Sequence, residues 1–148
     1  MKLPPAPVPG LVLCYAYLWK DEQRAARVEG RKDRPVVVVL ATRSLGSSTL
    51  VYVAPVSHDA RHAPGEAVEI PPAVKRHLGL DDEASFIVAT ELNVFVWPGP
   101  DLRPVPGRRS EEGGAPCSFG YLPRGLFRAL KQAIDRSARG ERMRVVKR

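Results

Sequence analysis

Short runs of apolar residues alternate along the chain with polar segments that are rich in proline and glycine. Apolar runs of this kind, bounded by turn-forming residues and enriched in valine and aromatic side chains, are typical of buried strands. Pro35 suits the first position of such a run, where a missing N–H costs a strand least. The pattern predicts strands over residues 11–19, 35–42, 49–56, 67–70, 85–90 and 94–97.

Two segments have helical spacing instead. Residues 70–80, IPPAVKRHLGL, predict one or two helical turns that stop at Gly79. A longer helix is predicted to begin near Pro123, which suits a first helical turn. Apolar residues at helical spacing give that helix one face that packs on the body. They are Leu126, Phe127, Leu130, Ala133 and Ile134.

The order of these elements indicates the fold class. The predicted strands are closely spaced, and the chain has neither a βαβ alternation nor an internal repeat, which favours a small barrel or sandwich. A chain of 148 residues is long enough for one compact domain with a real core. We therefore expect a single mostly β domain over residues 1–138, closed by the C-terminal helix. Residues 139–148 are basic and are expected to form a mobile tail.

Charge adds a class of partner to this picture. The formal net charge is +7, and an excess of this size in a small domain suggests a polyanion such as a nucleic acid, with plain solubility as the simpler explanation. The run over residues 11–19 is too short to span a bilayer, and the proline-rich N-terminus does not resemble a signal peptide. We therefore expect a cytoplasmic protein without a membrane partner. Cys14 and Cys117 are interpreted as small core residues or bystanders.

Candidate chemistry lies at two strand ends. The three histidines are scattered and complete no ligand set with cysteine or aspartate, so no metal or other cofactor is expected. If the second and third strands form an antiparallel hairpin, Arg34 and Ser57 meet on one side. A guanidinium and a hydroxyl there could hold a phosphodiester and stabilise a pentacoordinate transition state. The alternative is that Arg34 forms only a surface salt bridge with Asp33 or Glu29.

A family resemblance bears on this choice. The segment PGLVLCYAYLW, the later EGRKDRPVVVV and then VYVAPVSH resemble the opening half of the PemK/MazF family of toxin ribonucleases, over about residues 9–58. A weaker similarity, FGYLPRGLFRALKQAI, corresponds to the family's closing helix. The resemblance implies an SH3-like barrel and a homodimer. It also implies metal-independent cleavage of single-stranded RNA and neutralisation by a cognate antitoxin. The family's catalytic arginine falls on Arg34, and its catalytic threonine or serine falls on Ser57.

Other interpretations stay open. Residues 68–98 are similar to the AbrB-type swapped-hairpin motif, which would make the protein a non-catalytic nucleic-acid-binding regulator, although an acidic run replaces that motif's usual glycine. A third possibility is a degenerate toxin-like barrel that binds only a protein partner. The family's late-strand arginine motif has no counterpart in TELNVFVWPGPDLRPV, so Glu91 and Asn93 receive no role.

Further residues are candidates for contacts with RNA. Trp19 and Tyr17 could stack on bases, although aromatics in a first strand more often belong to the core. His58 could act as a general acid or base, or be a solvated loop histidine. Lys32 and Arg61 could contact phosphates, or belong to a solvated charged face.

Overall fold

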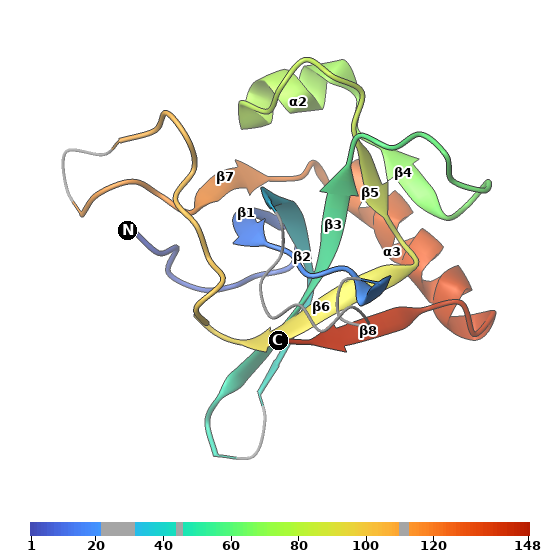
Figure 1. Ribbon diagram of the computed structural model, residues 1–148, viewed down its shortest axis with the longest axis horizontal. Helices are drawn as coiled ribbons and strands as arrows, with labels where there is room; N and C mark the ends of the chain where they lie inside the picture. Colours follow the sequence, from blue (N-terminus) through green and yellow to red (C-terminus); the bar gives the residue numbers. More distant parts are fainter. Residues whose placement is uncertain (22–31, 44–45, 110–112) are drawn as a thin grey trace.

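The computed structural model describes residues 1–21, 32–43, 46–109 and 113–148 (Figure 1). It is mostly β, with eight strands in one curled, largely antiparallel half-barrel sheet and a C-terminal helix. Among the described residues no helix is both long and apolar enough to cross a membrane. The strands are β1 (Leu11–Ala16), β2 (Asp33–Arg43), β3 (Thr49–Ser57), β4 (Ala67–Glu69), β5 (Phe86–Val88), β6 (Glu91–Val96), β7 (Ser118–Tyr121) and β8 (Arg144–Lys147). The helices are α2 (Pro72–Leu78) and α3 (Arg124–Arg139).

The central β2–β3 hairpin organises the sheet. Along one path the strand order is β4-β5-β3-β2-β1-β7, while β6 pairs with a different stretch of β3 and carries β8 on its other side. The antiparallel pairing of β2 with β3, predicted from the sequence, is confirmed. Because β3 pairs with β6 over Leu50–Val53 and with β5 at Val56 and Ser57, the sheet curls around its end.

The valine run of β2 is buried on both faces of the sheet. Val37 and Val39 belong to one apolar cluster, which α3 covers through Leu130 and other residues (Figure 1). Val36 and Val38 point to a second cluster inside the curl, together with residues from β1, β3 and β6. A strand buried on both sides has no polar alternation, which explains the uninterrupted apolar run.

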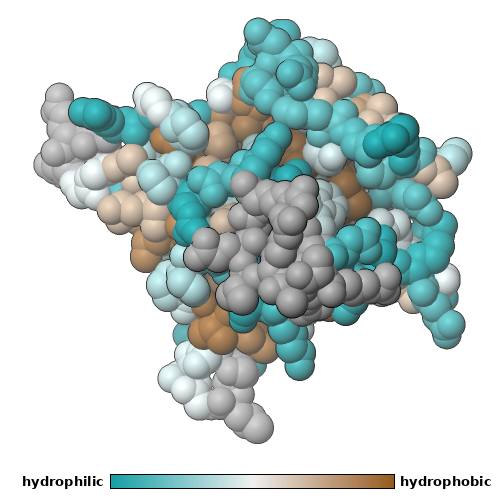
Figure 2. Space-filling view, in the orientation of Figure 1, coloured by the Kyte–Doolittle hydropathy of each residue, from teal (hydrophilic) through white to brown (hydrophobic). Residues whose placement is uncertain are grey.

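Helix boundaries follow the local sequence closely. Gly79 ends α2 in the left-handed conformation, at φ 70° and ψ 31°, and a Cβ at this position would collide with the guanidinium of Arg108. Pro123 precedes α3 with an extended backbone that leads into the first turn. Both helix predictions are therefore confirmed. Figure 2 shows hydrophilic residues over the exposed side of α2.

The C-terminal residues differ from the prediction of a mobile tail. Residues 144–147 form β8, which runs parallel to β6 with Val145 opposite Leu92. Val146 is fully buried. The guanidinium of Arg148 is also buried, and its Nη2 donates to Asp101 Oδ1 at 2.8 Å. The four residues RVVK lie within a basic segment and carry little periodicity of their own. Their strand structure comes from pairing with the distant strand β6.

Candidate active site

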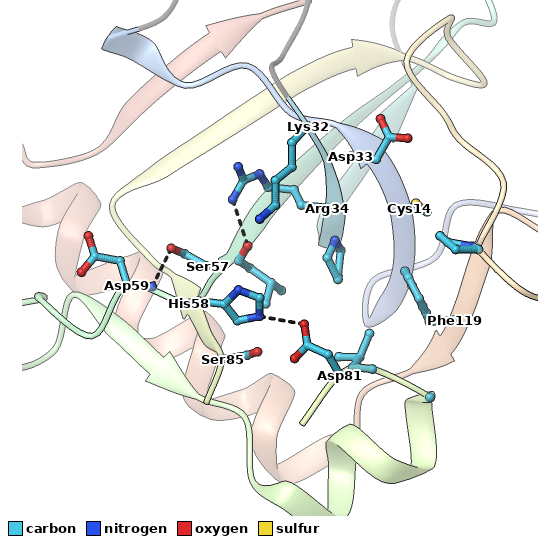
Figure 3. A pocket seen from close by; sticks show the side chains of 15 residues that line it. Cys14, Lys32, Asp33, Arg34, Ser57, His58, Asp59, Asp81, Ser85 and Phe119 are labelled. Carbon is cyan, nitrogen blue, oxygen red and sulfur yellow. Dashed lines mark hydrogen bonds and ion pairs between the residues drawn. The ribbon is translucent and has the colours of Figure 1, made fainter. Parts of the chain in front are cut away.

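Arg34 and Ser57 lie opposite each other, at the start of β2 and the end of β3. In the ladder between these strands Val36 pairs with Pro55, and the same register continued by two residues sets Arg34 against Ser57. Arg34 is half-buried, and its Nη1 donates to the carbonyl oxygen of Val56 at 3.4 Å. Figure 3 shows its side chain extending from β2 toward Ser57. The hairpin thus brings together the two residues that sequence reasoning selected.

Trp19 supports the guanidinium of Arg34. The centroid of the indole ring lies 5.0 Å from Cζ of Arg34, a distance at which a cation and an aromatic face attract each other. The same ring makes an edge contact with Tyr17, at 5.0 Å between ring centroids. Tyr17 is fully buried, so it belongs to the core and does not face a ligand. Arg34 therefore lies over an aromatic ring that the core holds in place.

The Ser57 hydroxyl is fixed by the turn that follows β3. Its Oγ accepts a hydrogen bond from the backbone N–H of Asp59 at 3.1 Å. Asp59 in turn forms a two-point contact with Arg61, at 3.0 Å to Nε and 3.1 Å to Nη2. These hydrogen bonds hold the pKa of Asp59 at about 2. Because Oγ accepts from the backbone, its own O–H can be directed at a ligand.

A hollow of about 620 Å³ opens on one side of this pair (Figure 3). We call it the Phe119 hollow. Its lining combines apolar side chains with charged and polar ones. It is lined by Cys14, Lys32, Asp33, Arg34, Pro35, Val56, Ser57, His58, Asp59, Gly79, Leu80, Asp81, Ser85, Pro106 and Phe119.

A second hollow, of about 520 Å³, adjoins the same pair. We call it the Glu91 hollow. It is lined by Trp19, Asp21, Arg34, Ser57, Asp59, His62, Glu66, Val88, Thr90, Glu91 and Arg144. Arg34, Ser57 and Asp59 line both hollows, so the two meet at the pair. The described residues that line the two hollows include more carboxylates than Lys and Arg side chains. Attraction for a phosphate therefore comes from individual cations such as Arg34 and not from the net charge of the walls.

His58, the residue after Ser57, is held by the loop that follows α2. Its Nε2 lies 2.8 Å from Asp81 Oδ2, and its Nδ1 lies 3.3 Å from Glu83 Oε2. Two carboxylates facing both ring nitrogens suit an imidazolium, in which both nitrogens donate. The Glu83 side chain is 73% exposed, so its ion pair with His58 is weak and exchangeable.

Buried Lys75 anchors the same loop from α2. Its Nζ donates to Asp81 Oδ1 and to Ser85 Oγ, both at 2.6 Å, and to the carbonyl oxygen of Glu83. Burial alone would raise the pKa of Asp81, but hydrogen bonds from Lys75 and His58 lower it below its ordinary value. Asp81 therefore stays ionised and keeps His58 directed toward the Phe119 hollow.

The remaining predicted RNA contacts separate into two groups. Lys32 lines the Phe119 hollow and extends beside Arg34 (Figure 3). Arg61 is not among the described wall residues of either hollow; its side chain is 90% exposed and bonded to Asp59. The structure therefore brings Trp19, Lys32 and His58 to the pair, and leaves Arg61 outside.

Cys14 lines the Phe119 hollow without being a nucleophile. Burial, followed by the nearby charge of Asp33, raises the pKa of the Cys14 thiol to about 11, so the group is protonated near neutral pH. Cys117 is also buried as a free thiol. The interpretation of both cysteines as core residues is confirmed.

Sequence reasoning missed several wall residues. Glu91 is 3% exposed. Its position in the apolar run ELNVFV could have indicated a buried carboxylate with specific polar partners, because charged side chains are rarely buried without them. Arg144 belongs to the basic C-terminal segment, whose arginines were candidates for phosphate contacts, but its fixed place in the wall was missed because the segment was expected to be mobile. Phe119 reaches the hollow from β7 and Asp81 from the loop after α2, and the placement of both depends on contacts with distant segments, so the sequence offered no local signal for them.

Comparison with known proteins adds no family assignment. No protein-family model matches the chain, and no curated protein matches its sequence. Within the described ranges, no group of three or more histidine, cysteine or acidic side chains is arranged to hold a metal ion. The geometry of the site is therefore the basis for proposing a function.

Proposed function

We propose that this protein is an endoribonuclease that cuts single-stranded RNA without a metal, as PemK/MazF-like toxins do. The observation that carries the proposal is the placement of Arg34 and Ser57 at the junction of two hollows. A phosphodiester held there has room for one nucleoside on each side. The half-barrel sheet with a C-terminal helix is compatible with the SH3-like barrel that the resemblance implies.

The chemistry uses the RNA's own 2′-hydroxyl as nucleophile. Its attack on phosphorus produces a pentacoordinate transition state with extra negative charge on the non-bridging oxygens. Arg34 offers planar N–H donors to these oxygens, and Ser57 offers its O–H. Both groups are held in position before the substrate binds, Arg34 by Trp19 and Val56 and Ser57 by the Asp59 N–H. Such preorganisation is a large source of catalysis.

His58 is the proton donor in this proposal. It follows Ser57 directly and lines the Phe119 hollow, with Asp81 and Glu83 at its ring nitrogens. When Nδ1 exchanges Glu83 for the leaving 5′-oxygen, the imidazolium can protonate that oxygen as its bond to phosphorus breaks. The products are a 2′,3′-cyclic phosphate and a 5′-hydroxyl.

The partners of the protein follow from the same proposal. Single-stranded RNA is the substrate, which suits a cytoplasmic location. The family resemblance adds a homodimer and a neutralising antitoxin to the proposal. Co-purification with a small acidic protein encoded in a neighbouring reading frame tests for the antitoxin.

The direct test is cleavage of single-stranded RNA by the purified protein in EDTA. We expect a product ending in a 2′,3′-cyclic phosphate, and we expect Arg34→Ala to abolish the cut. Arg128→Ala is the matched control, because Arg128 is exposed on α3 and lies outside the described walls of both hollows.

Two other results would replace the proposal. Intact RNA together with tight binding to duplex DNA would favour the regulator suggested by residues 68–98. Intact RNA without binding to either nucleic acid would favour a barrel that recognises only a protein.

A further inference from the structure

The position of the two hollows bears on how protons move during cleavage. In a displacement at phosphorus the attacking and leaving oxygens stand roughly in line, on opposite sides of the phosphorus atom. The Phe119 hollow, which contains His58, and the Glu91 hollow both adjoin a phosphate placed at Arg34 and Ser57. With His58 as the acid in the first hollow, the group that takes the 2′-hydroxyl proton is expected in the second.

Glu91 lies in that hollow, at the start of β6. It is 3% exposed, and both hydrogen bonds that the structure describes for its carboxylate go to one oxygen. Oε2 accepts from the Tyr17 hydroxyl and from the backbone N–H of Lys20, each at 3.1 Å. Oε1 lies 4.0 Å from Nε of Arg144, another wall residue of the same hollow.

The two oxygens thus have different surroundings. Oε2 fixes the carboxylate to two residues in the segment that follows β1, which orients the group. Asn93 has a comparable role two residues later, where its amide bonds both backbone groups of Leu18. Asn93 already ties this segment to β6, so the charge on Glu91 is not needed for that purpose. A buried carboxylate costs free energy, and a role for Oε1 in the hollow accounts for its presence.

We propose that Glu91 is the general base of the cleavage reaction, a role that rests on the proposed ribonuclease function. Glu91 Oε1 takes the proton of the 2′-hydroxyl while the 2′-oxygen bonds to phosphorus. The bond from phosphorus to the 5′-oxygen breaks, and that oxygen receives a proton from His58. Glu91 then releases its proton to water and His58 takes one back, so no oxidant, reductant or further reactant is required.

The surroundings of Glu91 favour this role. Burial raises its pKa, against the opposing effects of the Lys20 N–H, the Tyr17 hydroxyl and Arg144. A carboxylate with a raised pKa is a stronger base near neutral pH. The charged and titratable groups that face it or share its hollow are Tyr17 and Asp21 from the segment after β1, Arg34 from β2, Asp59, His62 and Glu66 from the segment after β3, and Arg144 from β8.

The direction of the RNA strand follows from this assignment. The nucleoside that carries the attacking 2′-hydroxyl occupies the Glu91 hollow, where Trp19 offers a ring for its base. The nucleoside that leaves through its 5′-oxygen occupies the Phe119 hollow, beside His58. RNA therefore runs 5′ to 3′ from Trp19 toward Phe119.

The test is the pH profile of kcat/KM for RNA cleavage by the full chain and by Glu91→Gln. Glutamine keeps an acceptor for Tyr17 and Lys20 but cannot take a proton. We expect cleavage to fall by about 10²- to 10⁴-fold and the decline of activity at low pH to disappear. Binding of an uncleavable 2′-deoxy oligonucleotide should remain. Tyr17→Phe is the control: it keeps the carboxylate but removes a hydrogen bond that lowers the Glu91 pKa, so the decline should persist and move to higher pH.

A substrate with sulfur in place of the bridging 5′-oxygen distinguishes the role of the general base from that of the general acid. A thiolate leaves without a proton, so His58→Ala should recover activity on this substrate, while Glu91→Gln should stay slow. Recovery of Glu91→Gln, or an unchanged low-pH decline in that variant, would overturn the inference while leaving the ribonuclease function intact. If the unaltered protein cuts no RNA at all, the function and the inference fall together.

Discussion

Cζ of Arg34 lies 5.0 Å from the centroid of the Trp19 indole ring. One residue comes from the start of β2 and the other from the segment after β1, and the contact links the phosphate-binding candidate to the second apolar cluster. The guanidinium is thereby held in position even though it faces a hollow.

Replacing Trp19 should weaken RNA cleavage without unfolding the protein. A cation–π contact contributes about 0.5–2 kcal/mol, so we expect Trp19→Ala to lower kcat/KM by about 2- to 30-fold, and Trp19→Phe to lower it less. Trp97 packs on the same cluster but outside the described walls of both hollows. Trp97→Ala should therefore reduce stability and leave kcat/KM of the folded enzyme nearly unchanged. Equal activity of Trp19→Ala and the unaltered protein would contradict the supporting role.

Removing the ammonium group of Lys75 should destabilise the loop that holds His58. Lys75→Met leaves the Ser85 hydroxyl and the Glu83 carbonyl without their buried donor, at a cost of about 1–3 kcal/mol. Urea unfolding measures this loss. Arg76→Met, an exposed change on the same helix, should stay within about 0.5 kcal/mol. If the two variants were equally stable, the anchoring role of Lys75 would be wrong.

Glu91→Gln should change how stability depends on pH. The folded-state pKa of Glu91 is raised, so the native state binds more protons than the unfolded chain above about pH 4.3, the usual value for glutamate. Stability from this group is therefore present at low pH and is lost as the pH rises toward the folded-state pKa. The free energy of unfolding of Glu91→Gln, relative to the unaltered protein, should increase through that window and then level off. A difference that does not vary with pH would show that burial of the charge has no net cost.

The ion pair between Arg148 and Asp101 should contribute substantially to the free energy of unfolding, although Arg148 lies in a basic segment. Both side chains are largely buried, at 5% and 12% exposure, and removing one partner leaves the other charge buried. We expect Arg148→Ala to cost about 3 kcal/mol in the free energy of unfolding. Lys147→Ala, at an exposed position next to it, should have little effect. A double-mutant cycle with Asp101→Asn measures the coupling, and a coupling near zero would contradict this account.

The sequence could predict the part of the site that depends on local pairing. Arg34 and Ser57 flank one hairpin, and the distance of each from its turn is enough to bring them together. Trp19 and His58 were near enough to those strand ends to be recognised as candidates. The hollow containing Glu91, in contrast, is assembled from the segment after β1 and from β2, β3, β5, β6 and β8, and no local pattern shows that these segments meet.

The same distinction explains which parts of the fold were predicted. Apolar runs and proline or glycine boundaries identified β2, β3, α2 and α3 almost to the residue. The short strands β7 and β8 were missed because four residues carry too little periodicity. Their structure comes from partners on β1 and β6, which lie far away in the sequence.

The pairing of β8 with β6 also sets an order of assembly. β8 follows every other described element along the chain, yet it supplies Arg144 to the wall beside Glu91. During synthesis, the hairpin with Arg34 and Ser57 can form well before residue 144 leaves the ribosome, whereas the neighbouring wall cannot. A nascent chain therefore brings Arg34 and Ser57 together for some time before its second hollow is complete.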